Sequence, residues 1–148
     1  MKEYRRSYKL LVAWTLALIP VMLGAAMLAE KAGMDDRGMI AMMMTAVVLM
    51  LLVLMWMIWK GEYVYWINGG PSFEEAKAAG SDVRREFAWR HLTAMLKGSA
   101  ATLALLSAEW LLGAHELVMV LTVGAGSIAS VIPMMKIKWP EVKHDSQN

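Results

Sequence analysis

Residues 67 to 91, INGGPSFEEAKAAGSDVRREFAWRH, form a polar and densely charged stretch between two of the most apolar runs in the chain. It opens with the glycine pair and proline of residues 69–71, which interrupt regular structure because glycine permits positive φ and proline removes a backbone donor. We therefore expect this stretch to lie in water, unlike the apolar runs on either side of it. The question is what lies on either side of the stretch and how the stretch itself folds.

Capping signals predict two helices inside this stretch. Ser72 followed by Glu75 forms the pattern of a capping box, and Gly80 is a natural stop for the short helix that it starts. Ser81 is then predicted to be the N-cap of a second helix, which meets no further break until Gly98 and is expected to run on to Gly113. We call the stretch of about 67–91 the elbow.

The rest of the chain divides into apolar blocks. Of its 148 residues, 58% are hydrophobic, against about 45–50% in an ordinary soluble domain. The blocks cover about 10–29, 38–59, 92–113 and 117–135. Each is close to the roughly 20 residues that cross a bilayer as a helix, and no alternating strand pattern competes with them. The sequence predicts an all-α integral membrane protein, a single membrane domain over 1–148, with four transmembrane helices in an antiparallel bundle and a short cytoplasmic elbow between the second and third.

The first block follows a basic start, MKEYRRSYK, and small residues lie near its end, so a cleaved signal peptide is an alternative. The length of the block favours a retained helix.

Basic residues predict the orientation. With four crossings, thirteen of the fifteen lysines and arginines fall on the side of the elbow and of both termini, and only Lys31 and Arg37 fall on the other. The positive-inside rule then places both termini and the elbow in the cytoplasm, with the plasma membrane as the expected location. Aromatic residues gather at the same end and predict an interfacial belt: Trp59, Tyr63, Tyr65, Trp66, Trp89 and Trp139.

The elbow carries three arginines, Arg84, Arg85 and Arg90, that we expect to meet anionic headgroups or a protein partner at the cytoplasmic face. The alternative is a solvated loop whose charge only enforces topology. Two capped helices are more than a connection requires, which keeps the docking hypothesis open.

Ionisable residues also lie in and beside the third block. Lys97 is near its inner end and can extend its ammonium to the interface. Glu109 lies about one turn from the outer end, and with His115 and Glu116 it is a candidate for coupling to an ion or a proton. At that depth Glu109 can also reach the outer headgroups, which leaves a purely interfacial role open.

Small residues recur every four positions in the third and fourth blocks, a pattern of close helix packing in membranes. The connection between the blocks is short, so the helices must be antiparallel neighbours. Counting inward from the turn at equal rise pairs Gly98 with Ser130 and Thr102 with Gly126. The two hydroxyls are expected to hydrogen-bond across the pair of helices.

The sequence lacks residues that several classes of function require. The chain has no cysteine, which excludes disulfides and thiolate metal sites, and no nucleophile or metal-ligand spacing indicates an enzyme, a metal or a cofactor. The methionines at 34, 39 and 42–44 are a conceivable Cu(I) site, but methionine is also an ordinary filler of apolar helices. The net charge is only +2, which says little about partners, and no nucleic-acid partner is expected.

Two functions from different classes remain. The first is a non-enzymatic accessory or interaction protein that acts through the elbow and its helix faces, with a membrane protein or a second copy of the chain as partner. The alternative is a small oligomeric transporter or channel for a cation or a proton-coupled substrate, in which Glu109 would couple. Oligomerisation would be needed because four short helices leave little room for a pathway.

Overall fold

The computed structural model describes residues 4–140, and Lys2 and Lys143, counted above among the basic residues, lie outside this range. The described part is all-helical and contains no strand. Its elements are α1 (Lys9–Lys31), α2 (Asp36–Gly61), the 3-10 turn η1 (Val64–Trp66), α3 (Phe73–Ala78), α4 (Ser81–Leu111) and α5 (Glu116–Met135). Three of these helices, α1, α2 and α5, are long and apolar enough to cross a membrane.

The third predicted crossing, 92–113, falls in the second part of α4, which ends slightly earlier, at Leu111. On length and composition α4 is not among the helices that qualify as spans. The reason lies in its residues, because its first turns belong to the polar elbow and its later part carries Lys97 and Glu109 among many small residues.

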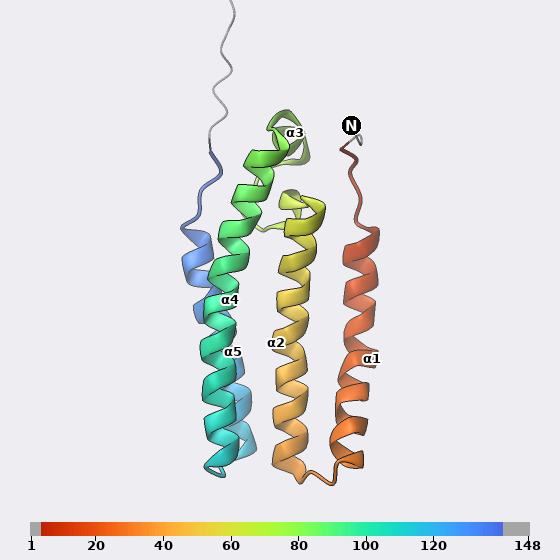
Figure 1. Ribbon diagram of the computed structural model, residues 1–148, viewed down its shortest axis with the longest axis vertical. Helices are drawn as coiled ribbons and strands as arrows, with labels where there is room; N and C mark the ends of the chain where they lie inside the picture. Colours follow the sequence, from red (N-terminus) through yellow and green to blue (C-terminus); the bar gives the residue numbers. More distant parts are fainter. Residues whose placement is uncertain (1–3, 141–148) are drawn as a thin grey trace, which may run out of the picture.

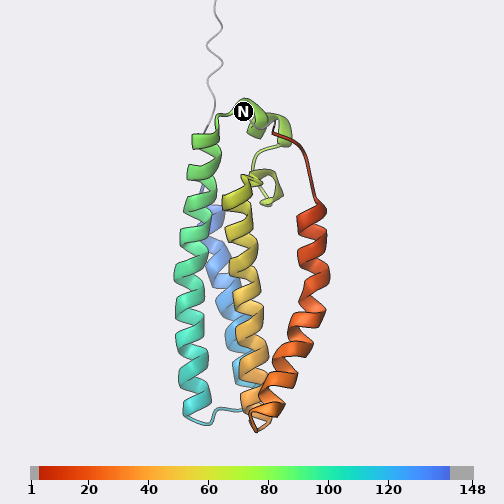
Figure 2. The same cartoon turned by 45° about the vertical axis from the view of Figure 1, so that its right-hand side comes forward.

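The central element is α2, which packs against α1 on one side and against α4 and α5 on the other. Figures 1 and 2 show α1 standing beside α2, away from α4 and α5. The core is therefore built by α2, α4 and α5, and α1 flanks it, rather than four helices closing equally around one axis.

Close packing of α1 is concentrated near its last turns, where Ala25 and Ala29 are its buried residues. Towards its start, α1 diverges from α2 (Figure 2). Pro20 lies inside the helix and removes one of its hydrogen bonds, which permits such a bend. The indole nitrogen of Trp14 still donates to the carbonyl oxygen of Met50 at 3.0 Å, so one polar contact ties the diverging half to α2.

Small residues bring α4 and α5 together. A Cβ atom added at Gly98 would lie 2.6 Å from the Cβ of Ser130, and one added at Gly126 would lie 2.8 Å from the Cγ2 of Thr102. Both distances are below any real carbon contact, so each glycine is required for this approach. The pairs are those obtained by counting from the turn, and we call them the α4–α5 seam.

The hydroxyls of the seam do not bridge the helices as expected. Thr102 donates to the carbonyl oxygen of Gly98 at 2.9 Å, and Ser130 donates to that of Gly126 at 2.7 Å. Each bond stays within its own helix, because a serine or threonine hydroxyl on a helix can reach the carbonyl four residues before it. Packing of small residues therefore holds the seam, without hydrogen bonds between the helices there.

A bulky side chain in the seam must separate α4 from α5. We expect Gly126→Leu to destabilise the protein by about 1–3 kcal/mol, the usual cost of overpacking, and to lower its thermal unfolding temperature in detergent. The control is Leu121→Ile, at a side chain that is 61% exposed, which should change stability by less than about 0.5 kcal/mol. Equal unfolding temperatures for the two variants would contradict the seam.

Candidate functional site

A buried ion pair closes the elbow. Arg84 Nε lies 2.8 Å from Glu62 Oε2, and the two side chains are only 10% and 15% exposed. The same guanidinium donates through an Nη nitrogen to the carbonyl oxygens of Ala76 at 2.9 Å and Ala79 at 2.5 Å. Arg84 therefore joins the end of α2, the end of α3 and the start of α4 at one point.

Glu62 occupies an unusual backbone position. It is the C-cap of α2 with φ of 58°, the left-handed region where helices most often place glycine. A residue with a side chain is strained there, typically by 1–2 kcal/mol. The side chain has a use that glycine could not supply, since its Oε1 atom accepts from Ser81 Oγ at 2.5 Å and from Arg85 Nε at 3.1 Å.

Ser81 is therefore not the N-cap that its sequence position indicates. Gly80 is the N-cap of α4 and has no side-chain cap, and the Ser81 hydroxyl is engaged by Glu62 instead. The other predicted cap is present. Ser72 and Glu75 exchange both hydrogen bonds of the capping box, at 3.2 Å and 2.7 Å, and α3 starts where predicted.

The surroundings of Glu62 stabilise its charge. Burial by itself raises the pKa of the Glu62 carboxyl, but the hydrogen bonds from Ser81 and Arg84, with the charges of Arg84 and Arg85, outweigh burial. The pKa therefore lies below its ordinary value of 4.5. The carboxylate is ionised at neutral pH and acts as the fixed negative centre of the elbow.

The segment before α1 is fastened to this centre. The Tyr4 ring lies over the Arg84 guanidinium at 4.1 Å, and the Tyr4 hydroxyl donates to the backbone oxygen of Glu62 at 2.6 Å. The backbone of Ser7 makes two hydrogen bonds with the Tyr65 hydroxyl, each 2.9 Å. The first described residues and the elbow are thus one structural unit.

Many of the aromatic residues predicted for an interfacial belt pack on one another at this end. Tyr63 and Trp66 stack with ring centroids 4.3 Å apart, and Trp59 contacts Trp89 at 5.6 Å. Beneath them an apolar cluster of Met55, Ile58, Val64, Ala76, Phe87, Ala88, Leu92 and Met95 anchors the elbow to α2 and α4. The elbow is therefore a packed structure rather than a loose connection.

The three predicted arginines have different environments. Arg84 is turned inward, and this burial argues against its predicted contact with headgroups or a partner. The side chains of Arg85 and Arg90 are 59% and 63% exposed, and Arg90 pairs with Glu86 one turn before it at 2.8 Å. Of the three arginines, only Arg85 and Arg90 are therefore exposed enough for the predicted contacts with headgroups or a partner.

A surface pocket of about 350 Å³ lies beside Arg90, where the first turns of α4 meet the segment after α5. Val83 and Phe87 supply apolar surface, and Asp82, Glu86, Arg90 and Lys138 supply charges of both signs. We call it the elbow pocket. Its mixture of an apolar lining and charged residues suits a peptide segment with an apolar anchor.

At the opposite end of the molecule, Glu109 contacts α5. Its Oε1 atom accepts from Thr122 Oγ1 at 2.5 Å. Its Oε2 atom is buried, and within residues 4–140 it has no hydrogen-bond partner. The carboxyl group therefore points into the protein rather than outward to headgroups.

His115 and Glu116 do not join Glu109. His115 is the N-cap of α5, accepting from the backbone nitrogen of Leu117 at 3.2 Å, and its Nδ1 lies 3.5 Å from Glu116 Oε2. Within the described range, no hydrogen bond or ion pair joins either residue to Glu109. The candidate coupling group is therefore Glu109 with Thr122, a partner that the sequence analysis did not select.

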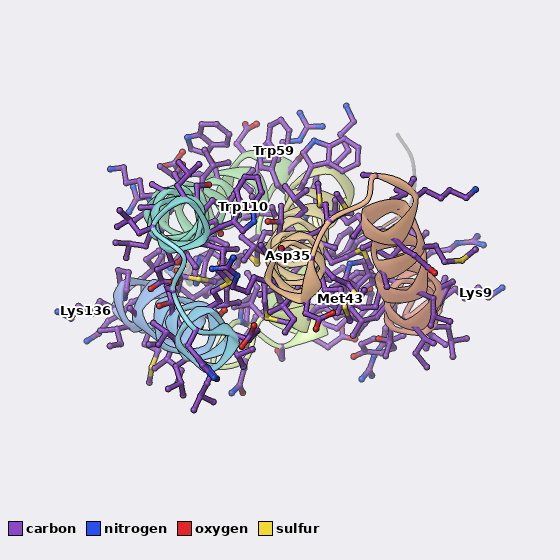
Figure 3. All side chains as sticks on the ribbon, turned by 90° about the horizontal axis from the view of Figure 1, so that it is seen from below. Lys9, Asp35, Met43, Trp59, Trp110 and Lys136 are labelled. Carbon is purple, nitrogen blue, oxygen red and sulfur yellow. The ribbon has the colours of Figure 1, made fainter. Side chains whose placement is uncertain are left out.

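The clustered methionines turn to different neighbours. Met34 and Met42 line a cavity of about 260 Å³ between α2 and α4, and Met44 packs against the cluster of Val48, Leu106, Met119 and Val123. Figure 3 shows Met43 on the side of α2 that faces α1. Met43 and Met44 therefore fill space between helices apart from the cavity that Met34 and Met42 share.

Glu62 is the central charged residue of this site, and the sequence pattern did not predict its role. A signal was available, since Glu62 is an acidic residue just after the end of an apolar block, on the side where basic residues gather. Its partner Arg84 lies 22 residues further on, so no local spacing links them.

No family model, curated protein or solved structure matches this chain. The function must therefore be argued from the two centres described above, the elbow and Glu109.

Loss of Arg84 would leave the Glu62 charge buried without its main partner. We expect Arg84→Met to destabilise the protein by about 2–4 kcal/mol, between the usual values for exposed and buried pairs. Arg85→Met, at the exposed partner of the same carboxylate, should cost less than about 1 kcal/mol. Unfolding in detergent monitored by circular dichroism measures both, and similar losses would refute the central role of Arg84.

The same experiment has a pH dependence with a definite sign. Because folding lowers the pKa of Glu62, the stability that its charge confers is present above pH 4.5 and is lost as the pH falls through the lowered pKa. The stability difference between the protein and Glu62→Gln should therefore shrink in acid. A difference that stays constant from pH 7 to pH 3 would contradict the ionised pair.

Proposed function

We propose that this chain is a four-crossing membrane protein and that it acts as a non-enzymatic accessory or interaction protein, docking a partner on its cytoplasmic elbow. The proposal has two parts, the crossing by α4 and the use of the elbow. Each is supported by different residues.

The packing of α5 supports the crossing by α4. The seam pairs residues 98 with 130 and 102 with 126, so the α4 residues opposite α5 are about 93–112. If α5 spans the bilayer, this part of α4 lies at the same depth beside it. Lys97 and Glu109 are its only charged side chains, one near each end, where the interface is within reach. The distribution of basic residues then favours the elbow on the cytoplasmic side.

The observation that carries the function is the elbow pocket on a rigid support. Binding costs less free energy when the receiving surface is already ordered. The buried pair of Glu62 and Arg84 and the capping box at Ser72 order the elbow without using its outer face. That outer face keeps Arg85, Arg90 and the elbow pocket exposed. The expected partner is a membrane protein with a cytoplasmic segment that places an apolar side chain in the pocket.

The test must change the outer face and spare the ion pair. In the variant Val83→Asp with Arg90→Glu, the pocket loses apolar surface and reverses a charge, and Arg84 is untouched. We expect a partner that co-purifies with the unaltered protein to decrease at least tenfold by native mass spectrometry, while the unfolding temperature is unchanged. Lys77→Glu, on the exposed side of α3, is the control and should retain the partner. Retention by all three proteins would remove the elbow pocket from the proposal.

Glu109 favours the second candidate, proton or cation transport by an oligomer. A buried carboxylate oxygen without a partner is costly in a membrane, and a proton or a cation would satisfy it. The bond from Thr122 holds the other oxygen and fixes the orientation of the group.

Flux into liposomes tests this candidate. If Glu109 lies on a pathway, Glu109→Gln should reduce proton flux about tenfold or more and leave the protein folded, because glutamine keeps the acceptor for Thr122 and loses the titratable group. Glu116→Gln, at a carboxylate on the same end, is the matched control and should conduct as before. Absence of flux in the unaltered protein, or equal flux in Glu109→Gln, would exclude transport through Glu109.

A further inference from the structure

We propose that a groove between α4 and α5, near their cytoplasmic ends, binds one anionic phospholipid with its phosphate against Lys97 and Arg90. This inference rests on the crossing by α4 proposed above. The groove adjoins the elbow pocket, with which it shares Glu86 and Arg90, and it does not require a protein partner.

The groove has a volume of about 600 Å³ and runs between the two helices from the seam pair Gly98 and Ser130 towards the elbow. Ala94 on α4 and Ala129 on α5 are small side chains that line it. Pro133 and Ile137 add apolar surface along it, and Trp89, Arg90 and Lys97 line the α4 side. The α4 side thus carries two cations, and the α5 side is apolar or small.

The depth of Lys97 fits the phosphate region. By the pairing of the seam, Lys97 lies opposite residue 131, and α5 ends at Met135. Four residues correspond to about 6 Å of helix. Helical side chains lean towards the N-terminus of their helix, which in α4 is the cytoplasmic end. The ammonium of Lys97 therefore extends towards the membrane surface.

The cationic side chains at the depth of Lys97 are available to bind an anion. Within the described part of the chain, no carboxylate lies within ion-pairing distance of Lys97. Arg90 is seven residues before it, about 10 Å along the same face of the helix, and its pair with Glu86 uses only the Nε atom. Lys136 adds a further charge at this end and points outward at the edge of the molecule (Figure 3). Glu86 is the one acidic group lining the groove, at the end away from Lys97.

The combination of cationic side chains and an apolar groove fits a phospholipid better than a free anion or a peptide. A free phosphate would use the cations and leave the apolar length of the groove unfilled. A peptide would bring polar backbone groups to the depth of Ala129, where no water satisfies them. A phospholipid presents a phosphate at the surface and an acyl chain below it, in the same order as Lys97 and Ala129.

Two variants test the site by different means. Lys97→Gln removes the charge at an exposed position, and Ala129→Trp fills the groove without changing any charge. Purified protein in neutral detergent is titrated with dioleoyl phosphatidylglycerol, and bound lipid is counted by native mass spectrometry. We expect one tightly bound lipid, weakened about fivefold by Lys97→Gln and at least as much by Ala129→Trp. Lys31→Gln, at the opposite end, is the control and should bind as the unaltered protein does.

Further measurements distinguish a lipid phosphate from free phosphate. They also distinguish failure of the lipid site from failure of the proposed crossing by α4. Equal affinity for dioleoyl phosphatidylcholine, or displacement of the lipid by inorganic phosphate at constant ionic strength, would overturn the anionic lipid site. Unchanged binding in both variants would overturn it as well. Single cysteines at positions 36 and 77 should label from opposite sides of the membrane. If they do and no lipid binds, the site fails and the crossing stands; same-side labelling would refute the crossing itself.

Discussion

The buried pair of Glu62 and Arg84 is the contact on which the elbow end of the molecule depends. Glu62 is the C-cap of α2 and Arg84 lies in the first turn of α4, so the pair joins the two ends of the segment between these helices. Two carbonyl oxygens at the end of α3 accept from the arginine, and Ser81 and the Tyr4 hydroxyl reach the glutamate. A buried charge is tolerable only when such bonds surround it. Glu62 has a strained backbone that glycine would avoid, so the bonds of its carboxylate must stabilise the fold by more than the strain costs.

The two ends of α4 are held by different physical means. At the elbow end, hydrogen bonds, charge and aromatic stacking act on a part of the helix that continues well past the end of α5. Farther along, the approach to α5 relies on the absence of side chains at Gly98 and Gly126. The groove with Lys97 lies between these two regions, since the seam residues Gly98 and Ser130 line one end of it and Trp89 and Arg90 of the elbow line the other. Its position follows from the unequal lengths of the two helices.

Features set by neighbouring residues could be predicted from the sequence. The capping box needs only Ser72 and Glu75, and the register of the seam follows from a turn too short to permit another one. The hydroxyl bonds of Thr102 and Ser130 were predicted to cross the seam and do not, because each hydroxyl also has a carbonyl of its own helix within reach. The pairing of Glu62 with Arg84 and the orientation of Glu109 towards Thr122 depend on how helices far apart in sequence are placed. The flanking position of α1 has the same origin, since its uniformly apolar surface does not specify which neighbours it will meet.

The attachment of Tyr4 and Ser7 to the elbow bears on the order of events during synthesis. These residues leave the ribosome before Glu62 and Tyr65, which follow 58 residues later, and Arg84 later still. Until α2 has formed and the chain has turned back, the segment before α1 has no place to dock. Contacts that join such distant parts of a chain form late, because a long loop must close before they are gained. The docking of the segment before α1 is therefore the step that reports a correctly formed α1–α2 hairpin, and a chain that had not reached that point would leave Tyr4 and Ser7 without their partners.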